Sequence, residues 1–106
     1  MTVVPVRGQI YRVDIGYGAK PWLIVSNNRR NRTLSDVLAV RITTSPKHVA
    51  LPTWVRLDPS DPLVGCVNTD DLQQLGRDEL GDLLGVLSPR TLMRVNEALQ
   101  LALALP

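Results

Sequence analysis

The sequence K-P-W-L-I-V-S-N-N-R-R-N, residues 20–31, is followed after a short polar stretch by V-L-A-V-R-I-T-T, residues 37–44. Residues 21–25 form a near-continuous apolar run, which is typical of a strand buried on both faces. Residues 37–42 are rich in β-branched side chains and predict a second strand. Polar and basic residues gather at the ends of both strands. Lys20 and Thr43 are therefore the first candidates for contact with a charged substrate.

Two polar segments interrupt this pair of strands. Residues 26–36, S-N-N-R-R-N-R-T-L-S-D, are expected to form a mobile, solvated loop whose arginines, Arg29, Arg30 and Arg32, could grip phosphates irrespective of base. Residues 43–48 predict a second polar loop. Thr44, Lys47 and His48 in that loop are further candidates for contact with the same charged ligand.

The remaining segments predict a small β-rich domain. Alternating or β-branched patterns favour strands over residues 9–15, 53–57, 65–68, 70–75 and 83–87. The segment D-P-S-D-P at 58–62 predicts a turn. A one-turn helix is expected near 78–80. Ser88 as N-cap and Pro89 at the first helical position begin a longer helix. Its predicted apolar stripe consists of Leu92, Val95, Leu99, Ala102 and Leu103.

Short strands with turns between them, followed by one terminal helix, predict a mainly β (α+β) fold, a small barrel capped by a helix. At 106 residues the chain is expected to be one domain, residues 1–106. Its single cysteine, Cys66, excludes an internal disulfide and any multi-cysteine metal site. The N-terminus is too quickly charged for a signal peptide, and no apolar run approaches the roughly 20 residues that cross a bilayer. A cytoplasmic protein is expected.

Charge is distributed unevenly along the chain. Residues 1–56 carry nine Lys/Arg and two Asp/Glu, whereas residues 57–106 carry three and eight, so a basic half precedes an acidic half. Such a basic half is typical of a surface that binds an anion, either RNA or an acidic protein segment. An ordinary mixed surface is the alternative.

Several motifs together resemble the MazF/PemK (Kid) family of toxin endoribonucleases. Nearly the whole chain takes part, through R-G-Q-I-Y-R-V-D-I from Arg7, K-P-W-L-I-V-S-N from Lys20, A-V-R-I-T-T from Ala39, L-G-V-L-S-P-R-T-L from Leu84 and the tail A-L-x-L-A-L from Ala98. The resemblance implies an SH3-like barrel with a C-terminal helix, usually a homodimer. It also implies metal-independent, sequence-selective cleavage of single-stranded RNA without a cofactor, and inhibition by an antitoxin with an acidic, disordered tail.

The family's catalytic pair is an arginine before the proline and a threonine at the end of the later strand. The threonine corresponds to Thr43, and Lys20 stands at the arginine position, keeping the charge without the planar fork. Gln73 replaces another arginine of the family pattern. In this interpretation Lys20 stabilises the charge of the transition state and Thr43 donates a hydrogen bond to it, while the general base stays open.

Each candidate also has a plainer interpretation. Lys20 is otherwise a solvated surface charge, and Thr43 otherwise reflects β-propensity. His48 is expected to be an ordinary loop residue rather than a catalytic base, and Trp22 and Trp54 are expected to pack in the core rather than stack on bases. Asp70 and Asp71 are too few for a metal site, and a solvated turn is expected there.

Two functions other than RNA cleavage are alternatives for this sequence. One is a non-catalytic toxin of the CcdB type, which inhibits gyrase by binding through its C-terminal tail. The tail of this chain, A-L-Q-L-A-L-A-L-P, is apolar enough to belong to the core or to a dimer contact. The other is a DNA-binding regulator, but no helix carries basic residues at groove spacing.

Overall fold

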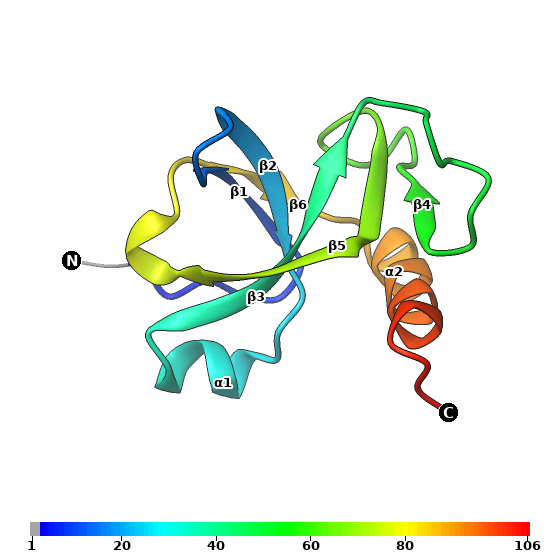
Figure 1. The fold of residues 1–106 in the computed structure, drawn as a ribbon. Coiled ribbons are helices and arrows are strands. Elements are labelled where there is room, and N and C mark those ends of the chain that lie inside the picture. Colours follow the sequence, from blue (N-terminus) through cyan, green and yellow to red (C-terminus); the bar gives the residue numbers. More distant parts are fainter. Residues whose placement is uncertain (1–2) are drawn as a thin grey trace.

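An antiparallel sheet runs through the described part of the chain, residues 3–106, in the computed structural model. Its strands are β1 (Gln9–Asp14), β2 (Ala19–Ile24), β3 (Asp36–Thr43), β4 (Trp54–Arg56), β5 (Cys66–Gly76) and β6 (Leu83–Val86). They lie in the order β4-β5-β3-β2-β1-β6. The sheet curls into a half-barrel, with helix α2 (Pro89–Ala102) packed beside β4 and β5 (Figure 1). The expected small barrel with a C-terminal helix is confirmed.

The two central strands, β2 and β3, are buried on both faces, as the apolar run predicted. Alternate residues belong to separate core clusters: Leu23 and Val40 face α2, whereas Trp22 and Ala39 face the other side. Each fully buried aliphatic side chain contributes roughly 1.5–3 kcal/mol to the stability of the fold. The face that holds Trp22 and Ala39 also holds Thr43, four residues after Ala39 on the same strand.

Helix α2 begins where the sequence predicts. The Ser88 hydroxyl accepts a hydrogen bond from the backbone N–H of Thr91, and Pro89 is the first helical residue. Val95 of the predicted stripe is buried, and Leu92 and Leu99 pack against the same core. Leu103, which was predicted to belong to the stripe, is half exposed and lies just after the last helical residue, Ala102.

A short helix stands where a mobile loop was expected. Helix α1 (Asn28–Thr33) occupies most of residues 26–36, so that prediction was wrong. The side chain of Asn27 caps the helix by accepting from the backbone N–H of Arg30 at 2.8 Å. Asn31 is fully buried: its amide donates to the carbonyl of Ser26 at 3.0 Å, and its oxygen accepts from the Ser26 hydroxyl. These bonds satisfy a polar side chain inside the fold and fix α1 to the end of β2.

The two strands predicted at 65–68 and 70–75 are one strand, β5, with an irregularity between its halves. Val40 of β3 is paired with Leu72, but the next residue, Arg41, is paired with Asn68, so residues 69–71 bulge out of the ladder. The bulge bends β5, as such insertions do. Its first half pairs with β3 on one side and β4 on the other, and its second half pairs with β3. The predicted one-turn helix is present as a 3-10 turn, Arg77–Glu79.

No helix among the described residues is both long enough and apolar enough to span a membrane.

Candidate functional site

A cleft opens at the end of β3, beside the bend in β5. Its volume is about 270 Å³. The lining comes from β3, the loop that follows it, β4 and β5, and consists of Arg41, Thr43, Ser45, Lys47, His48, Trp54, Asn68 and Asp71. Because the bulge at residues 69–71 shifts the register, Asn68 before the bulge and Asp71 within it both reach this cleft. Arg41, Lys47 and His48 therefore share one hollow with a single carboxylate and two hydroxyls.

Thr43 is held at the last position of β3 by local contacts. Its hydroxyl oxygen accepts a hydrogen bond from the backbone N–H of Ser45 at 3.1 Å, which leaves the hydroxyl proton free to donate to a ligand. Gly65 packs directly against the Thr43 carbonyl, where a Cβ would collide, and has φ +128°. Only glycine adopts that conformation readily, so Gly65 allows the segment just before β5 to pass close to Thr43.

Lys20 lies on the neighbouring strand at the same end. β2 and β3 pair through Trp22–Arg41, Leu23–Val40 and Ile24–Ala39. Continued by two residues, this register places Lys20 across from Thr43 and on the same face of the sheet. The ladder stops at Trp22–Arg41, however, and Lys20 lies outside the lining of the cleft. The two candidates are thus brought to one end of adjacent strands, with Thr43 in the cleft and Lys20 at its border.

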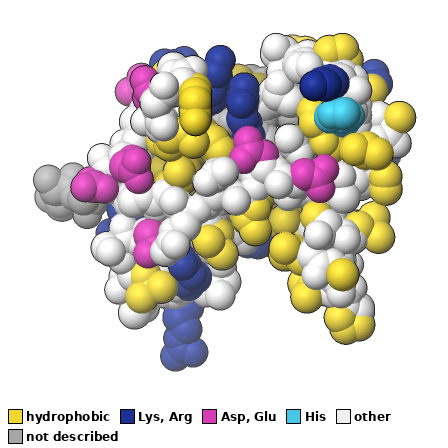
Figure 2. All heavy atoms as spheres, viewed as in Figure 1, with side chains coloured by type: hydrophobic (Ala, Val, Ile, Leu, Met, Phe, Trp, Pro, Cys, Tyr) yellow, Lys and Arg dark blue, Asp and Glu magenta, His cyan; other side chains and the backbone are white. Residues whose placement is uncertain are grey.

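The loop after β3 supplies the cleft's second wall. Lys47 and His48, two of the predicted RNA-binding residues, line the hollow. The His48 ring meets the Trp54 ring edge to face, with centroids 5.6 Å apart at 79°. Figure 2 shows the histidine exposed on this face, in the part of the molecule where β4 lies. Trp54 was expected to pack in the core, but it is only partly buried and presents an aromatic surface to the cleft.

The remaining predicted RNA-binding residues lie elsewhere. Arg29, Arg30 and Arg32 belong to α1, which precedes the first residue of β3, whereas Thr43 is its last. Eight residues of strand separate the two places by about 23 Å. Arg30 is bound to Asp36 at 2.7 Å, and this hydrogen bond lowers the pKa of the Asp36 carboxyl. Thr44 lines a different hollow, on the other side of the loop.

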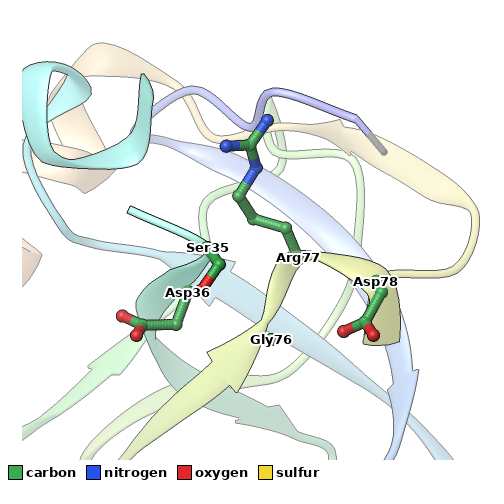
Figure 3. A pocket seen from close by; sticks show the side chains of 5 residues that line it. All are labelled: Ser35, Asp36, Gly76, Arg77 and Asp78. Carbon is green, nitrogen blue, oxygen red and sulfur yellow. The ribbon is translucent and has the colours of Figure 1, made fainter. Parts of the chain in front are cut away.

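A second pocket lies near α1, at the far end of β3 from Thr43. Its volume is about 340 Å³, and its lining is Ser35, Asp36, Gly76, Arg77 and Asp78 (Figure 3). The Arg77 side chain extends away from the two carboxylates and donates to the carbonyls of Val3 and Leu34, each at 3.1 Å. This arginine therefore ties the N-terminal segment to the end of α1, and the pocket shares no residue with the Thr43 cleft.

The aspartate pair of β5 has local partners. Asp70 accepts from the Thr53 hydroxyl at 2.7 Å, and Asp71 accepts from the Gln73 amide at 3.1 Å. Both lie in the bulge of a strand rather than in a free turn. Within residues 3–106, no three His, Cys, Asp or Glu side chains are grouped so that they could hold a metal ion.

Sequence reasoning missed Arg41 and Asn68, which line the cleft with Thr43. Arg41 could have been found, because it stands two residues before Thr43 on a predicted strand and so shares its face. Asn68 could not, because its place depends on the bulge in β5.

The chain belongs to the family of PemK-like, MazF-like toxins of type II toxin–antitoxin systems, whose pattern it matches over residues 6–103. The resemblance found in the motifs is thereby confirmed.

Mycobacterial relatives are similar over almost their whole length. The chain is 60% identical over 102 residues to proteins named Endoribonuclease MazF4, from Mycobacterium tuberculosis, and Endoribonuclease MazF1, from Mycobacterium bovis. The alignment covers 96% of this chain and 95% of each relative. A solved structure described as an endoribonuclease in complex with its cognate antitoxin, from a mycobacterial species, superposes with a TM-score of 0.92 at 60% identity. It covers 96% of this chain and 97% of that one.

Proposed function

We propose that this toxin is a metal-independent, sequence-selective endoribonuclease that cuts single-stranded RNA in the cytoplasm and thereby inhibits translation and growth. The observation that carries this proposal is the cleft at the end of β3, where the Thr43 hydroxyl lies among basic side chains. The names of the mycobacterial relatives, at 60% identity, support RNA cleavage as the activity.

The chemistry needs little besides charge and a hydrogen bond. The 2′-hydroxyl of RNA attacks the adjacent phosphorus, so that the O2′–P bond forms and the P–O5′ bond breaks. The 2′-hydroxyl proton leaves to a base, and the departing O5′ takes up a proton. The products are a 2′,3′-cyclic phosphate and a 5′-hydroxyl. Negative charge builds on the non-bridging oxygens, where a fixed cation and a hydroxyl donor stabilise it.

Lys20 and Thr43 are assigned to these roles. The Thr43 hydroxyl donates to a non-bridging oxygen, since its proton is not used in the hydrogen bond that its oxygen accepts from the N–H of Ser45. Lys20, at the same end of the adjacent strand, supplies positive charge. Lys47 and His48 bind flanking phosphates or bases from the opposite wall of the cleft. Arg29 and Arg32, on α1, are too distant from Thr43 to share one nucleotide with it.

The same basic cleft also fits a protein inhibitor. An antitoxin with an acidic, disordered tail would cover it by charge complementarity, and a similar toxin has been solved with its cognate antitoxin. We also propose a homodimer. Large apolar side chains stand exposed along and beyond α2, where a second copy would cover them: Met93, Leu101, Leu103 and Leu105.

A toxin that only binds a protein is the second candidate. The exposed apolar tail of α2 is the one observation in its favour, since a binding toxin would act through such a tail. It leaves the hydroxyl and basic groups of the Thr43 cleft without a purpose, and so RNA cleavage is the better supported function.

Product analysis tests the proposal. The purified protein is incubated with a pool of single-stranded RNAs, and the new 5′ ends are sequenced to find the cleaved motif. A synthetic RNA with that motif is then compared with a copy that lacks only the 2′-hydroxyl at the nucleotide before the cut. We expect 5′-hydroxyl ends and no cleavage of the deoxy copy. Cutting of the deoxy copy, or 5′-phosphate ends, would exclude the mechanism.

A further inference from the structure

Arg41 shares the cleft with Thr43 but has no place in the roles described so far. It stands two residues before Thr43 on β3, so both side chains are on the same face of the strand. Both line the hollow at the end of that strand. The two groups are therefore placed to meet one ligand from one side.

The Arg41 side chain carries a buried donor without an acceptor. Its Nε–H is buried and has no hydrogen-bond partner in the described part of the protein. The same holds for the indole N–H of Trp22, which is 2% exposed and lies directly opposite Arg41 in the β2–β3 ladder. An unmet buried donor costs about 1–3 kcal/mol, so two on facing residues form an uncommon arrangement.

The positive charge of Arg41 is also uncompensated. The two ion pairs among residues 3–106 join Arg12 to Asp82 and Arg30 to Asp36. Asp71, the carboxylate in the same cleft, makes no ion pair with Arg41 and accepts from Gln73 instead. The cleft is thus lined by a guanidinium that makes no ion pair among the described residues, and such a group is suited to bind a phosphate.

We propose that Arg41 is a further substrate-binding residue, whose guanidinium grips the non-bridging oxygens of an RNA phosphate beside Thr43. This inference rests on the proposed function, since it takes RNA as the ligand of the cleft. Lys20 offers a single ammonium at the border of the cleft, whereas Arg41 offers a planar fork inside it. The two cations divide the work: Arg41 fixes the phosphate in place, and Lys20 adds charge from the neighbouring strand.

The salt dependence of binding tests this proposal separately from cleavage. The probe is a fluorescent 2′-O-methyl RNA oligonucleotide, which cannot be cut by 2′-hydroxyl attack. Its affinity is measured by anisotropy at several KCl concentrations for the wild-type protein, Arg41→Gln and Arg41→Lys. Loss of one phosphate contact lowers the slope of log K against log[KCl] by about 0.7 for a single strand. We expect this change for Arg41→Gln and a partial loss of affinity, with the wild-type slope, for Arg41→Lys.

Arg90→Gln is the matched control, because it removes one exposed arginine from α2, on the other face of the sheet. Its slope depends only on long-range charge and should stay near the wild-type value. Thermal melting of each variant separates lost binding from lost folding. If Arg41→Gln unfolds at a lower temperature than the wild type, the comparison rests on Arg41→Lys, which retains the charge.

The outcomes distinguish this proposal from the proposed function. If the wild-type protein cuts unmodified RNA about 100-fold faster than Arg41→Gln, and this variant also lowers the slope of log K against log[KCl], RNA cleavage and the phosphate contact of Arg41 are both supported. If the slope depends on Arg41 but the wild-type protein does not cut RNA, Arg41 binds phosphate and the proposed activity is wrong. If the wild-type protein cuts RNA and folded Arg41→Gln binds with an unchanged slope, Arg41 is not a phosphate contact. If the wild-type protein does not bind the oligonucleotide, the inference about Arg41 is overturned.

Discussion

Replacing Asp61 should loosen α2 from the rest of the fold. Its carboxylate accepts three hydrogen bonds: from the Thr91 hydroxyl at 2.6 Å, the Ser88 N–H at 2.8 Å and the Asp58 N–H at 2.7 Å. These bonds tie the turn at 58–62 to the first turn of the helix. Thr91 is fully buried, so Asp61→Ala would leave its hydroxyl short of an acceptor.

The cost follows from these contacts. A hydrogen bond to a charged group is worth roughly 1.5–3 kcal/mol, and Asp61 is partly exposed, which reduces the sum of the three. We expect Asp61→Ala to lower the free energy of unfolding by about 3 kcal/mol. For a chain of this size the Tm should fall by about 15 °C. Circular dichroism during heating measures it. The control is Asp82→Ala, whose carboxylate is 81% exposed and makes one ion pair at 3.4 Å, and the Tm should hardly change.

The contribution of Asp61 should also depend on pH. Burial raises the pKa of the Asp61 carboxyl, but the hydrogen bonds from Thr91, Ser88 and Asp58 outweigh it and hold that pKa below its usual value. A carboxyl whose folded pKa is lowered stabilises the fold above its unfolded pKa and loses that effect as the pH falls. The Tm difference between wild type and Asp61→Ala should therefore be full near pH 7 and shrink below about pH 4. Equal Tm values at pH 7, or a difference that grows in acid, would refute this reasoning.

Three further predictions concern the cleft. EDTA should leave RNA cleavage unchanged in a gel assay, since charge comes from side chains, and activity that is lost and then restored by Mg²⁺ would contradict this. Lys20→Arg should cut at least as fast as wild type in a single-turnover assay if the side chain supplies charge only, and an inactive Lys20→Arg would show that the amine transfers a proton. Gly65→Ala should lower the free energy of unfolding by about 1–3 kcal/mol and slow cleavage, because a Cβ strains φ and collides with the Thr43 carbonyl. Unchanged urea unfolding and cleavage would show that the contact is unimportant.

The sequence predicted the sheet best where burial alone determines structure. The apolar run at 21–25 and the β-branched run at 37–42 gave β2 and β3, because a strand covered on both faces needs no polar alternation. Helix α2 was predicted from its cap and first proline. By contrast, α1 consists of polar residues, N-R-R-N-R-T, and is stabilised by the burial of Asn31 rather than by an apolar stripe. Hydrophobic periodicity carries no signal for such a helix.

The candidate site was predicted in part, and for a physical reason. Thr43, Lys47 and His48 are close in sequence and follow one strand, so their convergence needed no tertiary information. The arginines of α1 are close in sequence to the same strand, but at its beginning, and the length of β3 carries them away from the cleft. The wall formed by Asn68 and Asp71 depends on a register shift, which local sequence does not reveal.

Single-turnover cleavage of one RNA oligonucleotide by Thr43→Ala and Lys20→Ala is the most direct test of the proposed site. Thr33→Ala, on α1, and Arg90→Ala, on α2, are the matched controls, and all four variants are compared at equal folded concentration. Loss of one group that stabilises the developing charge should slow the chemical step about 100-fold or more. We expect that loss for Thr43→Ala and Lys20→Ala and wild-type rates for both controls. Wild-type rates for Thr43→Ala and Lys20→Ala would contradict it.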